Sequence, residues 1–264
     1  MEAAWRVVLD EPLPGIENMA RDAAVLERAE KSSRPFTTLR FYRWIIPTLS
    51  LGNKQDAAKT ADLDFCRTNG IDIVRRPTGG GAVLHHLELT YSIVSNDKNH
   101  FPHQNILENY LLIAQALCRG LKLLDVPAEI VEHSQVNERH DNYIQNPVPC
   151  FSSPSHYELL VKGKKIIGSA QKRLKSAFLQ HGSIPNQFDW ALQAGSMKAK
   201  VEPLREAMTC ISEHTSTVPG YRNLVEAFIQ GFAESFHVKV SLAPLDAAEL
   251  AESENMLEEF KVNY

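Results

Sequence analysis

The feature that most constrains this chain is a run of three glycines, Gly79, Gly80 and Gly81, that follows two adjacent arginines, Arg75 and Arg76. The β-branched residues just before the arginines predict a strand, and the apolar residues after the glycines predict two more. Glycine permits positive φ and lets a ligand lie against bare backbone N–H groups. Arginine side chains beside such a turn can donate hydrogen bonds to a phosphate or another polar group. The stretch therefore indicates a ligand-binding turn, or else a tight hairpin to which the arginines are incidental.

The rest of the chain mixes strands and helices without a regular strand–helix–strand order. Apolar residues at helical spacing predict helices over residues 15–31, 105–124 and 220–236. Alternating or β-branched residues predict strands over residues 5–9, 37–44, 48–51, 128–131, 156–161, 165–171 and 177–184. This order predicts an α+β fold with a mixed, largely antiparallel sheet flanked by helices. A glycine turn between two strands is the wrong setting for a dinucleotide or P-loop site.

Length and composition narrow the class of protein. With 264 residues, we expect one catalytic domain over residues 1–264, with a helical finish over residues 220–264. The net charge of -4 argues against broad nucleic-acid binding. No apolar run reaches membrane-spanning length, and the first residues lack a signal-peptide pattern. The four cysteines are far apart and form no CxxC pair, which fits a reducing cytosol. We therefore expect a cytoplasmic protein that binds neither nucleic acid nor membrane.

A second informative stretch begins at Lys165 and reads KIIGSA. If Lys165 opens a strand, strict alternation places Lys165, Ile167 and Ser169 on one face. The small residues Gly168, Ser169 and Ala170 leave room beside the strand for a long, thin ligand. A lysine there can bring positive charge to a carbonyl or phosphate oxygen. The alternative is that Lys165 is a solvated strand end.

Together, the two stretches resemble the lipoate–protein ligase and octanoyltransferase family, whose members are relatives of biotin ligase. The family signature is an RRxxGGGxxxHD-like turn plus a lysine in a K-[IV]-x-G-S-A strand, and the resemblance covers residues 5–240. The chain departs from the signature at His86, where an acid is usual. The resemblance implies the fold of the biotin/lipoate protein ligases. It also implies a substrate site formed by Arg75, Arg76, Gly79, Gly80, Gly81, His85, Gly168, Ser169, Ala170, His181 and Gly182.

Within that family, Cys150 separates two activities. By resemblance, the ligases activate a free acid with ATP and need no cysteine, whereas the octanoyltransferases hold the acyl group as a thioester on a cysteine. Residues 149–158 resemble the cysteine segment of the ligase-like octanoyltransferases of many bacteria, although the triple glycine is the ligase-like form. A thiolate is the reactive form of cysteine, and a nearby Lys165 ammonium would favour it. Alternatively, Cys150 is an inert loop cysteine, as we expect for the packing residues Cys66, Cys118 and Cys210.

The leading prediction is a catalytic pair, Cys150 and Lys165. The resemblance implies that the protein moves an octanoyl group from acyl carrier protein to a lysine of a lipoyl-domain protein. It also implies that the glycine-cleavage H protein is a favoured acceptor and that no cofactor is needed. The first alternative is an ATP- and Mg²⁺-dependent lipoate or octanoate ligase, with Arg75 and Arg76 on an adenylate phosphate. The second is a non-catalytic protein that binds acyl carrier or lipoyl-domain proteins. His85 is either a packed strand residue or an active-site donor, and His181 either supports the structure or lines the acyl pocket.

Two further groups of residues have simpler explanations. His133, His140 and His156 are irregularly spaced, so we predict no metal site. A basic cluster is either a solvated hairpin or a surface that attracts the acidic acyl carrier protein. Its members are Lys162, Lys164, Lys165, Lys172, Arg173 and Lys175.

Overall fold

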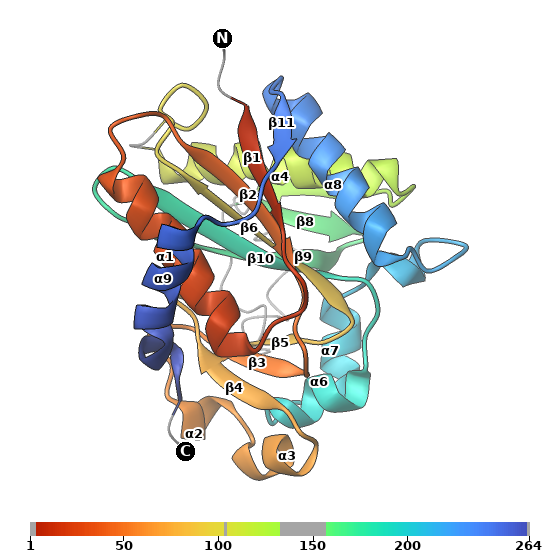
Figure 1. Ribbon diagram of the computed structural model, residues 1–264. Helices are drawn as coiled ribbons and strands as arrows, with labels where there is room; N and C mark the ends of the chain where they lie inside the picture. Colours follow the sequence, from red (N-terminus) through yellow and green to blue (C-terminus); the bar gives the residue numbers. More distant parts are fainter. Residues whose placement is uncertain (1–3, 103–104, 133–156, 263–264) are drawn as a thin grey trace.

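The computed structural model describes residues 4–102, 105–132 and 157–262. Eight strands form a large mixed sheet in the order β11-β1-β2-β6-β10-β9-β8-β7, and three form a small sheet in the order β4-β3-β5 (Figure 1). Helices flank both sheets, which confirms the predicted α+β class. The strands are β1 (Trp5–Leu9), β2 (Thr37–Tyr42), β3 (Thr48–Leu51), β4 (Asp72–Arg75), β5 (Val83–His85), β6 (Glu88–Ser95), β7 (Glu129–Glu132), β8 (Tyr157–Val161), β9 (Lys164–Arg173), β10 (Phe178–Pro185) and β11 (Val240–Leu242).

The three predicted helices, over residues 15–31, 105–124 and 220–236, are all present, with their ends within one residue of the prediction. The α-helices are α1 (Gly15–Lys31), α2 (Ala57–Thr60), α3 (Leu63–Thr68), α4 (Ile106–Leu123), α6 (Trp190–Ser196), α7 (Val201–Ala207), α8 (Tyr221–Phe236) and α9 (Ala247–Met256), and the 3-10 helices are η2 (Ile211–Glu213) and η3 (Leu257–Phe260). None of the helices in the described ranges is both long enough and apolar enough to cross a membrane.

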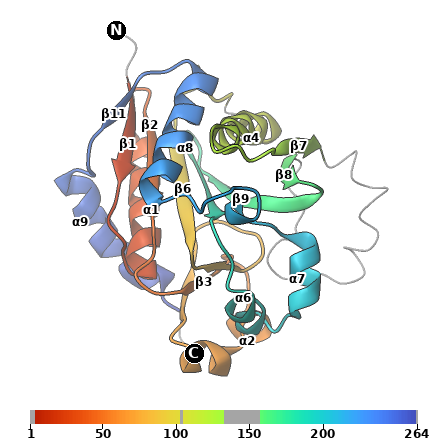
Figure 2. The same ribbon diagram turned by 90° about the vertical axis from the view of Figure 1, so that its right-hand side faces the viewer.

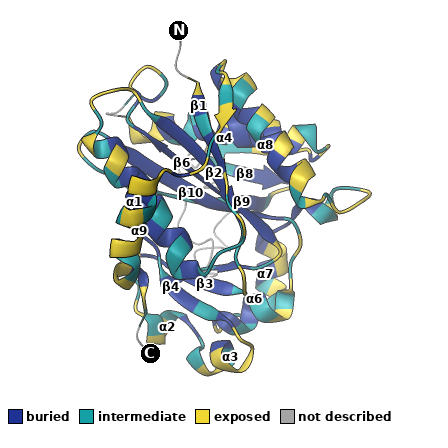
Figure 3. Cartoon of the chain, in the orientation of Figure 1, coloured by how far each residue is buried: buried dark blue, intermediate teal, exposed yellow. Residues whose placement is uncertain are grey.

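The large sheet is covered by helices on both faces. Alternate residues of each strand face opposite ways: Val7 and Ile93 join the cluster under α4 and α8, whereas Val8 and Val94 join the cluster under α1. Figure 2 shows the sheet nearly edge-on, with α1 and α9 on one side and α4 and α8 on the other. Figure 3 shows that the strands are mostly buried and that the exposed residues lie on the outer sides of the helices.

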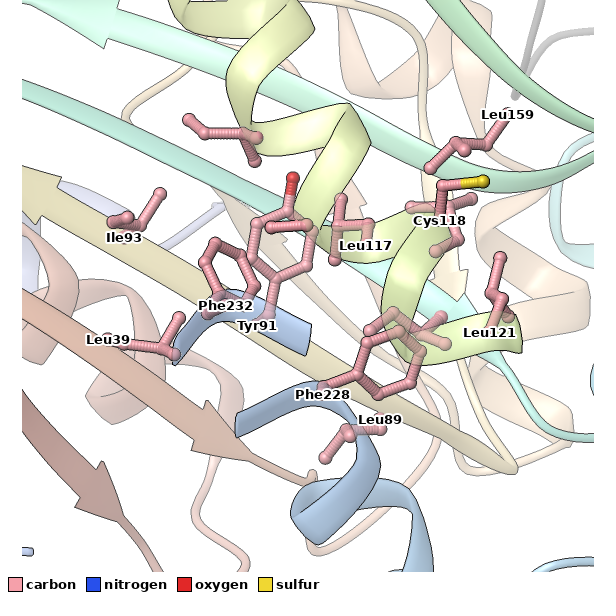
Figure 4. Packing of buried hydrophobic residues seen from close by; sticks show 14 of the residues in the cluster. Leu39, Leu89, Tyr91, Ile93, Leu117, Cys118, Leu121, Leu159, Phe228 and Phe232 are labelled. Carbon is pink, nitrogen blue, oxygen red and sulfur yellow. The ribbon is translucent and has the colours of Figure 1, made fainter. Parts of the chain in front are cut away.

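The larger core cluster lies between α4, α8 and the sheet. Leu117 and Leu121 of α4 meet Phe228 and Phe232 of α8 above Tyr91 of β6 (Figure 4). The two helices approach closely because α4 has glycine at the crossing. A Cβ on Gly120 would lie 2.4 Å from a ring carbon of Phe228. This packing fixes one face of the strands whose other face carries the site described below.

The C-terminal segment packs against α1 on the opposite face. Asp246 caps α9 with a capping box, and Glu249 of that helix binds Arg6 of β1 through two hydrogen bonds of 2.6 and 2.7 Å. Phe260 of η3 then packs in a cluster with Met19 and Tyr42. The end of the chain therefore supports the helix that covers the site.

The small sheet has an apolar side and a polar side. Leu49 and Leu51 of β3 belong to the cluster with the helices α3, α6 and α7, and Ser50 between them points the other way. Strand β3 pairs in parallel with β4 and antiparallel with β5. The polar side of this sheet faces the α1 side of the large sheet.

Asp56 caps α2, because its side chain accepts hydrogen bonds from the backbone N–H groups of Ala58 and Lys59. Cys150, His133, His140 and His156 lie outside the described residues.

Candidate active site

The site is built on two rows of side chains that cross four strands of the large sheet. Residues paired across neighbouring strands point to the same face. We define the first row as Arg40, Ser92, His181 and Ala170, and the second row as Tyr42, Thr90, Ser183 and Gly168, in the strand order β2, β6, β10, β9. Both rows face α1 and the polar side of the small sheet.

A pocket lies between these rows and the small sheet. Met19 of α1, Ser50 of β3 and Val83 of β5 contribute to its opposite wall. The predicted site residues that line it are Arg76, Gly80, Gly81, His85, Lys165, Gly168, Ser169, Ala170, His181 and Gly182. Two motifs from distant parts of the chain therefore meet at one cavity. Arg75 and Gly79 are not among its lining residues, and Cys150 lies outside the described residues.

A β-bulge in β9 aims Lys165 at the pocket. Leu160 pairs with Lys165, but Leu159, the residue before Leu160 in β8, pairs with Ile167. Ile166 is therefore an extra residue without a partner in the ladder. The bulge shifts the alternation by one position and places Lys165 on the same face as Gly168. The strict alternation that grouped Lys165 with Ile167 was therefore wrong. The solvated alternative for Lys165 was also wrong, because the residue is only 8% exposed.

Arg76 holds the glycine turn in shape. Its guanidinium donates to the carbonyl oxygens of Gly81 at 2.7 Å and Ser50 at 3.0 Å, and to Thr78 Oγ1 at 3.1 Å. Gly80 has a φ of +89°, the left-handed region that favours glycine. Arg76 thus lines the pocket and also fixes the backbone that forms its edge.

Arg75 binds a different segment. Its guanidinium donates to the carbonyl oxygens of Gly52 at 3.1 Å and Gln55 at 2.8 Å. A Cβ on Gly52 would lie 2.2 Å from the Gly80 carbonyl oxygen. Arg75 therefore stabilises the loop that packs beneath the glycine turn.

A chain of hydrogen bonds runs from the core to the same turn. Asp22 of α1 accepts from Arg40 at 2.8 Å, and the distance from its Oδ2 to His181 Nδ1 is 3.1 Å. His181 Nε2 lies 2.7 Å from Thr78 Oγ1, which in turn accepts from Arg76. The order of groups is Arg40, Asp22, His181, Thr78, Arg76.

Burial and neighbouring charges fix the protonation states of Asp22 and His181 in this series of hydrogen bonds. Burial lowers the pKa of His181, although Asp22 opposes the shift. Burial alone would raise the pKa of Asp22, but the Arg40 guanidinium and the hydrogen bond from His181 hold it below its ordinary value. His181 is therefore a neutral imidazole whose Nδ1–H donates to Asp22. Its Nε2 accepts from the Thr78 hydroxyl.

Sequence reasoning missed Asp22 and Arg40. Asp22 follows Met19 by three residues and precedes Leu26 by four, so it lies on the apolar face of α1. An acid on the apolar face of a helix indicates a buried partner, and this signal was available in the sequence. Its partners are not local, so the pattern does not identify them.

His85 joins a second polar group on the other side of the pocket. Its Nε2 lies 2.9 Å from Ser50 Oγ, and its ring stacks on Trp44 with the ring centres 4.1 Å apart. Below it, Glu88 accepts from Thr90 and Ser183, each at 2.6 Å. His85 is thus both a packed residue and part of the pocket lining.

Lys165 has an acidic partner that sequence reasoning did not find. Its Nζ lies 2.9 Å from Oε1 of Glu158, on the neighbouring strand β8. The two side chains are 9% and 11% exposed, so water screens the pair only weakly. The wall of the pocket therefore presents an ammonium group that is held by a carboxylate.

The cysteines within the described ranges are not suited to nucleophilic attack. Cys66, Cys118 and Cys210 are buried and free of disulfides, as expected for packing residues. Burial raises the pKa of Cys66 to about 11 and also raises the pKa of the other two. Since a thiolate is the reactive form, none of these three can readily supply it. Among the described residues, no group of three His, Cys, Asp or Glu side chains could hold a metal ion.

Residues 14–233 match the family described as the lipoyl protein ligase A/B catalytic domain, and the chain belongs to that family. Within it, the chain is 37% identical to an octanoyltransferase LipM of Brevibacillus brevis over 96% of this chain and 94% of that protein. It is also 37% identical to an octanoyltransferase LipM of Carboxydothermus hydrogenoformans, over 97% of this chain and 95% of that protein.

Solved structures show the same fold. A lipoate–protein ligase A bound with ATP superposes with a TM-score of 0.79 at 25% identity, covering 97% of this chain and 95% of that one. A bipartite lipoate protein ligase from Thermoplasma acidophilum gives a TM-score of 0.77 at 23% identity, covering 98% and 93%. The predicted family and fold are confirmed.

Proposed function

We propose that the protein is an octanoyltransferase that takes its acyl group from acyl carrier protein and passes it, through a thioester on Cys150, to a lysine of a lipoyl-domain protein. The observation that carries the proposal is the pocket itself, where Lys165, the glycine turn and the small residues of β9 converge. Relatives named octanoyltransferase over nearly the whole chain support it.

In the first step, the Cys150 thiolate attacks the thioester carbonyl of the donor. A C–S bond to Cys150 forms, the C–S bond to the carrier breaks, and the carrier's thiolate takes a proton from solvent. One thioester replaces another, so the step needs no ATP. Lys165 is the group that stabilises the oxyanion as the carbonyl becomes tetrahedral.

In the second step, the deprotonated amine of the acceptor lysine attacks the thioester on Cys150. A C–N bond forms, the C–S bond breaks, and the proton of the attacking amine goes to the leaving sulfur or to water. Because an amide is more stable than a thioester, this step is downhill. The protein acts here by orientation and charge stabilisation, without a cofactor.

We propose lipoyl-domain proteins as acceptors, with the glycine-cleavage H protein as the specific candidate. The bipartite ligase of Thermoplasma acidophilum belongs to a lipoylation system with its E2 lipoyl domain, which supports an acceptor of this kind. For the donor, the basic hairpin around Lys162 and Lys164 is a candidate surface for acidic acyl carrier protein. We propose that this reaction takes place in the cytoplasm.

The test is intact mass spectrometry after mixing the protein with octanoyl carrier protein in the absence of ATP. We expect one octanoyl adduct, mapped by peptide analysis to Cys150, and its loss on addition of an acceptor domain. Cys150→Ala should abolish the adduct, whereas the matched control Cys66→Ala should keep it. Full transfer by Cys150→Ala would reject the covalent route.

The second candidate is an ATP-dependent lipoate or octanoate ligase. It is favoured by the ligase-like triple glycine and by the similarity to a lipoate–protein ligase A bound with ATP. This candidate predicts activity with free lipoate, ATP and Mg²⁺, and none with octanoyl carrier protein alone. Running both assays side by side separates the two functions.

A further inference from the structure

We infer that Glu158 is a positioning residue that holds the Lys165 ammonium at the pocket wall and thereby sets the rate of acyl transfer. The inference rests on the proposed function, because it assigns a task to the proposed partner of Cys150. The observation behind it is the ion pair of 2.9 Å between Glu158 Oε1 and Lys165 Nζ.

The β8–β9 hairpin explains how the two residues meet. Lys165 pairs with Leu160, and Glu158 lies two residues from Leu160 on the same strand, so Glu158 and Leu160 share a face. The Glu158 carboxylate therefore reaches Lys165 diagonally across the ladder. Because of the bulge at Ile166, Gly168 faces the same side of the sheet as Lys165 and also lines the pocket. One hairpin thus carries the cation, its counter-ion and the narrow part of the pocket.

Burial makes this pair stronger than a surface ion pair. Both side chains are about nine-tenths buried, so water screens their attraction only weakly. A lysine side chain also has many rotamers, and fixing it in one of them costs conformational entropy. Glu158 offsets this cost before the substrate arrives, so Lys165 is already oriented.

The geometry assigns Glu158 an indirect role. Lys165 lines the pocket, whereas Glu158 is not among the residues that line it. An ammonium has three N–H donors, and Glu158 accepts one of them. The carboxylate therefore orients Lys165 from behind, and the ammonium is the group that meets the acyl oxygen.

Single-turnover acylation by octanoyl carrier protein tests the inference. Glu158→Gln keeps the shape and removes the charge, so we expect acyl-enzyme formation to slow by roughly 10- to 100-fold, the effect of losing a hydrogen bond between charged groups. Glu158→Asp, which keeps the charge, should recover part of the rate. The matched control is Glu129→Gln, an exposed glutamate opposite Leu160 on β7, which should react like the wild type.

A double-mutant comparison distinguishes positioning from general support of the fold. In a Lys165→Ala background, Glu158→Gln should cause no additional loss of rate, because the carboxylate acts only through the lysine. A loss of rate that is equal in both backgrounds would overturn the inference.

The outcomes also separate this inference from the proposed function. If the wild-type protein forms no acyl-enzyme, the proposed function fails. If the wild type reacts and Glu158→Gln reacts equally fast, only the inference fails. Should Glu158→Gln melt at a clearly lower temperature, the Glu158→Asp protein carries the test. For that protein too, a loss of rate that is equal in the wild-type and Lys165→Ala backgrounds would overturn the inference.

Discussion

His181 is a neutral imidazole in the folded protein because burial lowers its pKa. In the unfolded chain, a histidine titrates near its ordinary value of about 6.5. Between that value and the lower folded one, the unfolded state binds the additional proton. Stability therefore rises with pH in this range and is lost as the pH falls below about 6.5.

We expect His181→Gln to lose less stability than the wild type when the pH drops from about 7.5 to 5.5, because the imidazole that resists protonation is gone. Urea denaturation at both pH values measures the difference. Asp22 does not interfere, since its pKa is lowered from 3.8 and its contribution is lost only in stronger acid. Equal pH dependence in both proteins would contradict the hydrogen-bond arrangement described for His181.

At the scale of a structural element, the glycines of the glycine turn are not equivalent. Gly80 has a φ of +89°, and an added Cβ would lie 3.0 Å from Arg76 Nη2. The conformation of Gly79 suits other residues, and a Cβ there would meet nothing closer than Asn53 Oδ1 at 3.9 Å. Of Gly79 and Gly80, it is Gly80 that requires glycine, because of its positive φ.

Gly80→Ala should therefore lower the free energy of unfolding by about 1–2 kcal/mol, the cost of a left-handed alanine. Gly79→Ala is the matched control and should change it by less than about 0.5 kcal/mol. Thermal or urea denaturation of the two variants provides the comparison. A Gly79→Ala protein that is as unstable as Gly80→Ala would show that the turn adopts another shape.

The elements that the sequence predicts well are those with a local signal. The apolar spacing of α4 and α8 and the β-branched residues of β4 were sufficient to place them. The two glycine- and lysine-containing motifs also supply half of the residues that line the pocket. The bulge at Ile166 was missed because a bulge has no periodic signal. The Glu158–Lys165 pair and the Asp22–His181 chain were missed because each depends on how strands or helices meet in space.

For the whole molecule, the C-terminal segment supports the N-terminal helix over the site. Phe260 is 5% exposed and packs in one cluster with Met19, which lines the pocket. Truncating it leaves a cavity behind α1, so Phe260→Ala should cost about 3–4 kcal/mol of stability. Glu259→Ala, at an exposed neighbouring position, is the control and should be nearly neutral.

Acylation of Phe260→Ala should also slow, because Met19 is free to move into the pocket. Comparing the rate at a temperature where the variant is fully folded isolates this effect from unfolding. A destabilised protein with unchanged acylation would show that α1 is held in place without the C-terminal segment.

The two rows of site residues have a consequence for synthesis on the ribosome. Their members come from β2, β6, β9 and β10, so the last of them is made only when residue 183 has been added. Until then, Asp22 lacks its imidazole partner and β6 has an unpaired edge in the middle of the future sheet. A nascent chain that ends between the glycine turn and β9 therefore lacks at least half of each row, and the acyl site can form only once β9 and β10 have been made.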